Sequence, residues 1–302
     1  MTRLRVHGVA LLLLAVGVGL LELPGITGNS PVLSQPPGPP VALAEAISRL
    51  GLSQSGRDIL ERARHYWRLG STSELLTRVK WGLASRTDAV LTRTLDPKTG
   101  KEGRKREVSV YIRQGQTLVE TTLDIAHELV HATAPPAWDP YDPDLTLGRY
   151  ILAAIEGEGG EVEAVAQECE VASQVFPADA VTRERCGRYV GGQGRVPASL
   201  VGSGLGSRSG IRDSIRKDFY RSGRWFADLQ KNLGMEKGIF PLLSADSPVL
   251  YSSTGNAPYP AALMREYREL NLTACKNTLK RLDTETQTMR FAQRFIQKRC
   301  GE

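Results

Sequence analysis

Apolar residues recur at helical spacing along most of this chain, with one β-rich stretch in its first half. Three short helices are predicted at residues 44–50, 56–69 and 73–80. Residues 90–95 and 107–112 are rich in β-branched residues, which is typical of strands. The segment between these two runs contains proline and glycine, so we predict a hairpin with a long loop.

Helical spacing returns after the predicted strands and continues toward the end of the chain. One helix is predicted over residues 114–133, where prolines follow it, and another over residues 161–176. Residues 187–210 are rich in glycine and have little hydrophobic pattern, which indicates a loop, and residues 211–302 form a basic helical region. The predicted fold class is therefore α+β and mainly helical, with a small β-sheet or hairpin before the helix at 114–133.

The first part of the chain has the pattern of an export signal. Arg3 and Arg5 precede an apolar stretch at residues 6–21, which is shorter than the roughly 20 residues of a comfortable membrane span. Residues 26–41 are rich in proline and carry no charge, as in an extended spacer. We expect residues 1–25 to be a signal peptide or an N-terminal membrane anchor. The folded part then starts near residue 42 and is exported: periplasmic, extracellular or tethered to the outer side of a membrane.

The four cysteines are an even number, and exported cysteines tend to form disulfides. Cys169 and Cys186 lie on either side of Pro177 and are the favoured pair, since they can close a helical hairpin. Cys275 and Cys300 flank a run that has the pattern of nearly continuous helix. If that helix is unbroken it separates them by about 37 Å, far beyond the roughly 7 Å that a disulfide spans between Cα atoms. A bond from Cys169 or Cys186 to the C-terminal helix stays open.

Overall composition is that of a globular protein. Hydrophobic residues make up 41% and charged residues 24%, which excludes a mostly disordered chain and a polytopic membrane protein. The net charge is only +6. A basic stretch near Arg212, Arg216 and Arg221 contains aromatic residues, but Asp213 and Asp218 dilute its charge, which favours a solvated helix face. We therefore expect no nucleic-acid partner.

The residues that indicate chemistry are H-E-L-V-H at positions 127–131, inside the predicted helix 114–133. His127 and His131 lie one turn apart on one face, so both imidazoles can reach a single metal ion. Glu128 points about 100° away, where its carboxylate can act on a water without binding the metal. An apolar stripe on the other side of the helix anchors it to a core; the stripe consists of Leu118, Thr122, Ile125, Ala126, Leu129 and Ala132.

This motif, followed by a glutamate-rich helix that begins Glu161-Val162-Glu163-Ala164, resembles the gluzincin branch of the zincin metallopeptidases, and small bacterial metallopeptidases in particular. The resemblance covers roughly residues 88–176 and implies a zincin-like domain over residues 42–186. The metzincin branch is disfavoured, because Ala134 and Ala137 stand where that branch has glycine and histidine.

The resemblance implies one Zn²⁺ per chain. His127, His131 and a glutamate of the second helix would hold it, and Glu128 would act as general base. It further implies that the strand at 107–112 is an edge strand that aligns an extended peptide.

Glu161 and Glu163 both fit the position of the third ligand. Projected at 100° per residue, Glu161 falls beside the buried arc of its helix, near Val165, whereas Glu163 falls on the polar side with Gln167. A carboxylate turned toward a buried face is costly unless it meets a metal or a cation. We therefore predict Glu161 as the ligand, with Glu163 as the alternative.

These features predict an exported zinc metalloendopeptidase-like hydrolase whose partner is a peptide or protein substrate. The alternative is a non-catalytic binding or scaffold protein that keeps the zincin fold and acts through its basic helical C-terminal half. Glu128 favours the enzyme, since scaffold use does not need a carboxylate between the two histidines.

Overall fold

The computed structural model describes residues 4–6, 42–95, 102–190, 206–220, 259–282 and 289–301. The expected apolar stretch and proline-rich spacer lie almost entirely outside the described residues, as does most of the glycine-rich segment. Within the described part, no helix is both long and apolar enough to cross a membrane.

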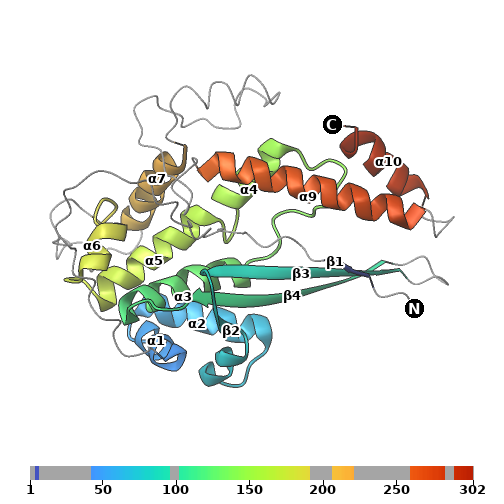
Figure 1. Cartoon of the computed structure of the whole chain (residues 1–302). Helices are drawn as coiled ribbons and strands as arrows, with labels where there is room; N and C mark the ends of the chain where they lie inside the picture. Colours follow the sequence, from blue (N-terminus) through green and yellow to red (C-terminus); the bar gives the residue numbers. More distant parts are fainter. Residues whose placement is uncertain are drawn as a thin grey trace, which may run out of the picture.

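Helices surround one small sheet, so the fold class is α+β and mainly helical (Figure 1). The described residues between 42 and 190 contain seven helices: α1 (Leu43–Leu50), α2 (Gln54–Trp67), the 3₁₀ helix η1 (Thr72–Thr77), α3 (Leu118–Thr133), α4 (Leu147–Glu156), α5 (Glu161–Val175) and α6 (Ala180–Cys186). The later helices are α7 (Gly206–Tyr220), α9 (Tyr259–Leu282) and α10 (Met289–Arg299). Because α7 starts at Gly206, the loop expected over 187–210 ends earlier than predicted.

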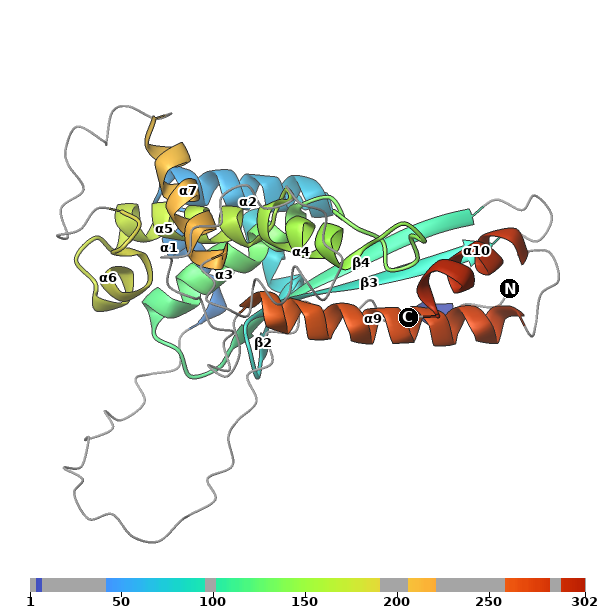
Figure 2. The same cartoon turned by 90° about the horizontal axis from the view of Figure 1, so that it is seen from above.

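The sheet has the strand order β1-β3-β4-β2. Strands β3 (Arg86–Leu95) and β4 (Glu102–Arg113) pair in antiparallel register and form the expected hairpin, with both strands longer than predicted. The hairpin projects beyond the helices of the first half (Figures 1 and 2). Strand β1 (Leu4–Val6) pairs with β3, and β2 (Val79–Gly82) runs parallel to β4.

One expectation about this region is wrong in part and another is wrong. Strand β4 lies between β3 and β2, and β2 pairs with residues 110–113, so residues 110–112 are not at an edge, whereas residues 107–109 have a described pairing with β3 alone. Residues 73–80 are not one helix, because η1 ends at Thr77 and the chain then enters β2. Val79 is buried, so its side chain contributes to the core from a strand and not from a helical turn.

Helix α3 is the centre of the first half and contacts the sheet as well as α1, α2 and α5. It begins at Leu118 and not at residue 114, because Gly115 turns the chain with a φ of 78° and Thr117 caps the helix. Thr117 and Glu120 form a reciprocal capping box that satisfies the first free N–H groups. Most residues of α3 are buried, and the face that carries His127 and His131 is also largely buried.

Helix α5 lies between two hydrophobic cores. Ala164, Cys169 and Val171 pack into the core that contains α1, α2, α3 and the sheet. Val162 and Ala166 pack into a second core that is formed with α4, α7 and α9. The first turn of α5, where Glu161 lies, is therefore enclosed on both sides.

Both disulfides join neighbouring helices. Cys169 of α5 is bonded to Cys186 of α6, the pair that the sequence favours. Cys275 is bonded to Cys300, which contradicts the expectation of an unbroken helix between them. The run is divided into α9 and α10, and the two helices pack together, which brings the two Cα atoms to 5.6 Å.

Candidate metal centre

His127 and His131 lie one turn apart on α3, and their rings turn toward the same point. Their Nε2 atoms are 3.1 Å apart, with the ring planes at 72° to one another. Both side chains are largely buried. The i and i+4 spacing thus brings the two imidazoles together as the sequence predicts.

Glu161 reaches the same point from the first turn of α5. Its carboxylate oxygens lie 3.4 Å from His127 Nε2 and 3.5 Å from His131 Nε2. The residue is only 3% exposed. Glu163 is placed elsewhere: its carboxylate accepts hydrogen bonds from the Gly159 N–H at 3.0 Å and from Gln167 at 2.9 Å. Of the two glutamates, the structure brings Glu161 to the histidines.

The other nitrogen of each imidazole has an acceptor. His127 Nδ1 lies 3.0 Å from a carboxylate oxygen of Glu168, and His131 Nδ1 lies 2.6 Å from the Gly159 carbonyl oxygen. Because a carboxylate and a carbonyl oxygen only accept, each Nδ1 carries a hydrogen, so in the neutral imidazole it is the Nε2 lone pair that faces the site. The sequence reasoning missed Glu168. Its signal was the seven-residue spacing from Glu161, which places both on one helix face.

Gly159 holds its carbonyl on His131 because the loop before α5 lies against α3. Its φ is 67°, in the left-handed region that favours glycine. A Cβ at this position would lie 2.1 Å from the Cβ of Ala134, so any side chain would push the loop away from α3. This close approach also brings Glu161 next to the histidines.

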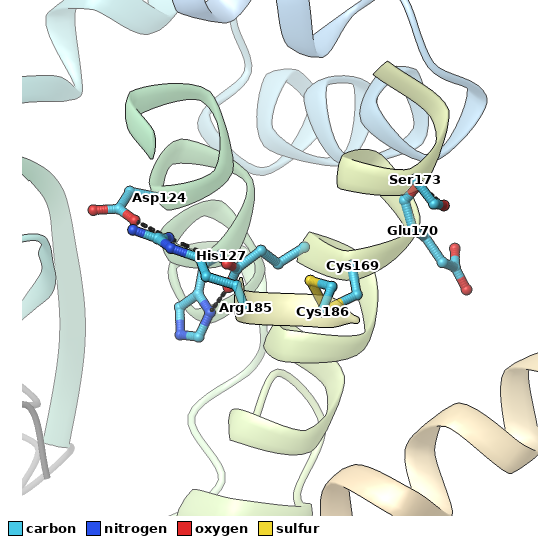
Figure 3. The surroundings of a disulfide bond; sticks show 8 residues. Asp124, His127, Cys169, Glu170, Ser173, Arg185 and Cys186 are labelled. Carbon is cyan, nitrogen blue, oxygen red and sulfur yellow. Dashed lines mark hydrogen bonds and ion pairs between the residues drawn. A yellow bond between two sulfur atoms is a disulfide. The ribbon is translucent and has the colours of Figure 1, made fainter. Parts of the chain in front are cut away.

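A charged network supports the His127 side of the site. Arg185 of α6 donates to Asp124 at 2.7 Å and to Glu168 at 3.2 Å. Glu168 and Arg185 are the residues that precede Cys169 and Cys186. The disulfide therefore ties together the two segments that carry this ion pair. Figure 3 shows Arg185 extending from beside the disulfide toward Asp124 and His127.

Asp124 is ionised within this network. Burial alone would raise the pKa of its carboxyl, but the Arg185 charge and hydrogen bonds from Ser85, Arg185 and Gln116 lower it below the ordinary value. No local pattern in the sequence indicated this network, because Asp124, Glu168 and Arg185 come from three separate helices.

Glu128 lies next to His127 and is buried, at 3% exposure. Its Oε2 accepts a hydrogen bond of 2.7 Å from the Thr87 hydroxyl of β3. Burial raises the pKa of Glu128 to about 8, although the His127 charge and the Thr87 hydrogen bond pull it down. Glu128 is thus hydrogen-bonded to a neutral donor in a buried environment, which favours its protonated form and so the uptake of a proton.

The two histidines titrate differently. Burial lowers the pKa of His127, but hydrogen bonds and charges from Glu161 and Glu168 outweigh it and raise this pKa well above its usual value. For His131, burial outweighs the Glu161 charge and the Gly159 hydrogen bond, and the pKa is lowered. A carboxylate-rich pocket therefore attracts positive charge to the point between the rings.

The three ligand atoms fit a zinc ion. Zn–N and Zn–O bonds of about 2.0–2.1 Å at tetrahedral angles place ligand atoms about 3.3–3.4 Å apart. The two Nε2 atoms are 3.1 Å apart, and each lies 3.4–3.5 Å from a different carboxylate oxygen of Glu161, Oε2 from His127 and Oε1 from His131. Two lone pairs and a carboxylate that converge in a buried space also need a cation between them. His127, His131 and Glu161 are the group of metal-ligating type that the described residues bring within 4.8 Å of one another.

Comparison with known proteins adds no further support. No protein-family model matches the chain, and no curated protein or solved structure matches it.

Proposed function

We propose that the chain is a zinc-dependent hydrolase that cleaves peptide bonds. One observation carries this proposal: two imidazole nitrogens and the carboxylate of Glu161 converge on one buried point, and Glu128 is the residue next to His127. Three protein ligands leave a fourth position open, which distinguishes catalytic from structural zinc sites. The two disulfides further favour an oxidising compartment, in agreement with export.

Each residue has a defined part in the proposed reaction. His127, His131 and Glu161 would hold the zinc ion, which would supply Lewis acidity for the scissile carbonyl and would lower the pKa of water toward about 7. Glu128 takes a proton from the attacking water and passes it to the leaving amine. Thr87 orients the Glu128 carboxylate, while Glu168 and the Gly159 carbonyl fix the histidine tautomers.

The test separates metal binding from catalysis. The purified full chain should carry close to one zinc and hydrolyse a peptide library. Glu128→Gln should keep the zinc and lose hydrolysis, because this substitution removes only the proton acceptor. Zinc binding without hydrolysis by the native chain would contradict the enzyme and favour the non-catalytic scaffold. Hydrolysis at the native rate by Glu128→Gln would instead remove Glu128 from the mechanism.

A further inference from the structure

A cavity of about 150 Å³ opens beside His131. One wall is β3, where Thr87, Ala89 and Leu91 alternate onto a single face. Prolines and Trp138 from the segment after α3 form the opposite, apolar wall, together with Ala153 of α4. A buried apolar cavity of roughly this volume holds a benzene molecule. The space therefore fits one leucine- or phenylalanine-sized side chain.

Arg106 of β4 is the cation in the cavity wall. It lies opposite Leu91 in the hairpin register, and it is half-buried. Its Nη1 donates to the Tyr66 hydroxyl at 3.0 Å and to the Ala134 carbonyl at 2.9 Å. Both acceptors are uncharged, and both bonds are made by Nη1. The N–H groups of Nε and Nη2 of the Arg106 guanidinium take part in neither bond.

No carboxylate of the described residues forms an ion pair with Arg106, whereas nearby Arg104 pairs with Asp139 and Arg185 pairs with Asp124. A half-buried guanidinium without a carboxylate favours an incoming anion, which it can bind in bidentate fashion. Glu158 also borders the cavity but is solvent-exposed, so water screens its charge more strongly than that of Arg106.

The cavity connects this guanidinium to the proposed chemistry. His131, a proposed zinc ligand, and Arg106 both line it. Consecutive residues of a substrate are about 3.8 Å apart. If the scissile carbonyl lies at the ligand cluster and the next side chain enters the cavity, the following carbonyl group lies near Arg106.

Resting on the proposed hydrolase function, we propose that the enzyme is a carboxypeptidase that releases a single apolar C-terminal amino acid, whose free carboxylate pairs with Arg106 and whose side chain fills the cavity. One water is consumed. A C–O bond forms on the penultimate residue, the C–N bond breaks, and Glu128 carries the proton from the water to the amine of the released amino acid. The proposed hydrolysis of peptide bonds is thereby restricted to the last peptide bond of the substrate.

The first test needs no substitution. The zinc-loaded full chain is given an acylated peptide that ends in phenylalanine, either as the free acid or as its C-terminal amide. Loss of one charge-assisted hydrogen-bonded pair weakens binding roughly 10- to 100-fold. The value of kcat/KM for the free acid should therefore exceed that for the amide by this factor. Equal hydrolysis of both, or cleavage at internal bonds regardless of the terminus, would overturn the carboxypeptidase assignment and leave the hydrolase proposal intact.

A binding measurement keeps the inference testable if hydrolysis fails. Calorimetry on zinc-loaded Glu128→Gln should show N-acetyl-phenylalanine binding more tightly than its amide by a similar factor. Arg106→Gln should remove that preference, and Arg104→Gln, two residues away on the same strand, should keep it. Ala153→Phe should weaken binding of N-acetyl-phenylalanine but not of N-acetyl-glycine. If the acid is preferred but no peptide is cleaved, the hydrolase proposal fails and the carboxylate site stands. If acid and amide bind equally, the carboxylate site is wrong.

Discussion

The two disulfides lie in regions of very different chemistry. Cys169–Cys186 joins α5 to α6, and the residues before the two cysteines, Glu168 and Arg185, form an ion pair that reaches His127. Cys275–Cys300 joins α9 to α10 beside a small apolar cluster with Phe295. The first disulfide therefore lies behind the candidate metal centre, and the second lies in the C-terminal helices.

Chain entropy alone does not separate these bonds. They close segments of 17 and 25 residues, and loops of this size give similar stabilisation of about 3 kcal/mol each. The two disulfides differ in the residues beside them. Only Cys169–Cys186 adjoins charged residues, Glu168 and Arg185, that orient a proposed zinc ligand, His127. A covalent bond can thus contribute to folding alone in one region and to both folding and the site in the other.

The largest effect is expected at the proposed ligand on α5. Glu161→Gln should weaken zinc binding by more than the roughly 10- to 100-fold typical of a supporting residue, because a ligand charge is lost. Glu163→Gln is the matched control, two residues away in the same turn, and should change zinc affinity little. Chelator competition on both variants measures this. The reverse ranking would show that Glu163 is the ligand.

A smaller effect on zinc affinity is expected from Glu168, which contacts the proposed ligand His127. Glu168→Gln should lower zinc affinity by roughly 10- to 100-fold, because the carboxylate that accepts from His127 Nδ1 is lost. Glu170→Gln on the same helix, whose carboxylate accepts from Ser55, is the control. Equal affinities of the Glu168 variant and the native chain would remove Glu168 from the account of the site.

The disulfides themselves give the direct comparison. Replacing Cys169 and Cys186 by alanine should lower zinc affinity several-fold, below the effect of Glu168→Gln, because Arg185 loses its covalent support. Replacing Cys275 and Cys300 should leave zinc affinity unchanged. Both pairs should lose about 3 kcal/mol of unfolding free energy, measured in denaturant after zinc removal so that metal binding does not contribute. A matching loss of zinc affinity in both double variants would contradict the comparison.

The smallest effect is expected from a side chain beside the second disulfide. Asn271 donates to the Arg299 carbonyl at 2.8 Å and accepts from Arg299 Nε at 2.9 Å. Asn271→Ala should lower the unfolding free energy by about 1–2 kcal/mol, the value of two hydrogen bonds, with unchanged zinc affinity. A change in zinc affinity would indicate that this region contributes to the site after all.

Local patterns in the sequence predicted what is local in the structure. The mainly helical class, the β3–β4 hairpin and the helix that carries His127 and His131 follow from periodicity and spacing over one or two turns. The burial of Glu161 followed from the helical arc of α5, because burial of an isolated helix face is readable from period alone.

Features that depend on distant segments were not readable in this way. The parallel pairing of β2 with β4 makes the end of a predicted helix, residues 79–80, part of a strand, and it also places β4 between two strands over residues 110–113. The break between α9 and α10 was missed because both sides have helical spacing, and so Cys275–Cys300 was excluded. Thr87, Glu168 and Arg185 reach the site from elements that only packing brings together.

X-ray absorption at the zinc edge tests the central claim most directly. The zinc-loaded full chain should show two imidazole shells and oxygen ligands at about 2.0–2.1 Å, without sulfur. His127→Ala should lose one imidazole, whereas His65→Ala, on the exposed face of α2, should leave the spectrum unchanged. Zinc–sulfur distances of about 2.3 Å, or an unchanged spectrum in His127→Ala, would show that the metal binds elsewhere.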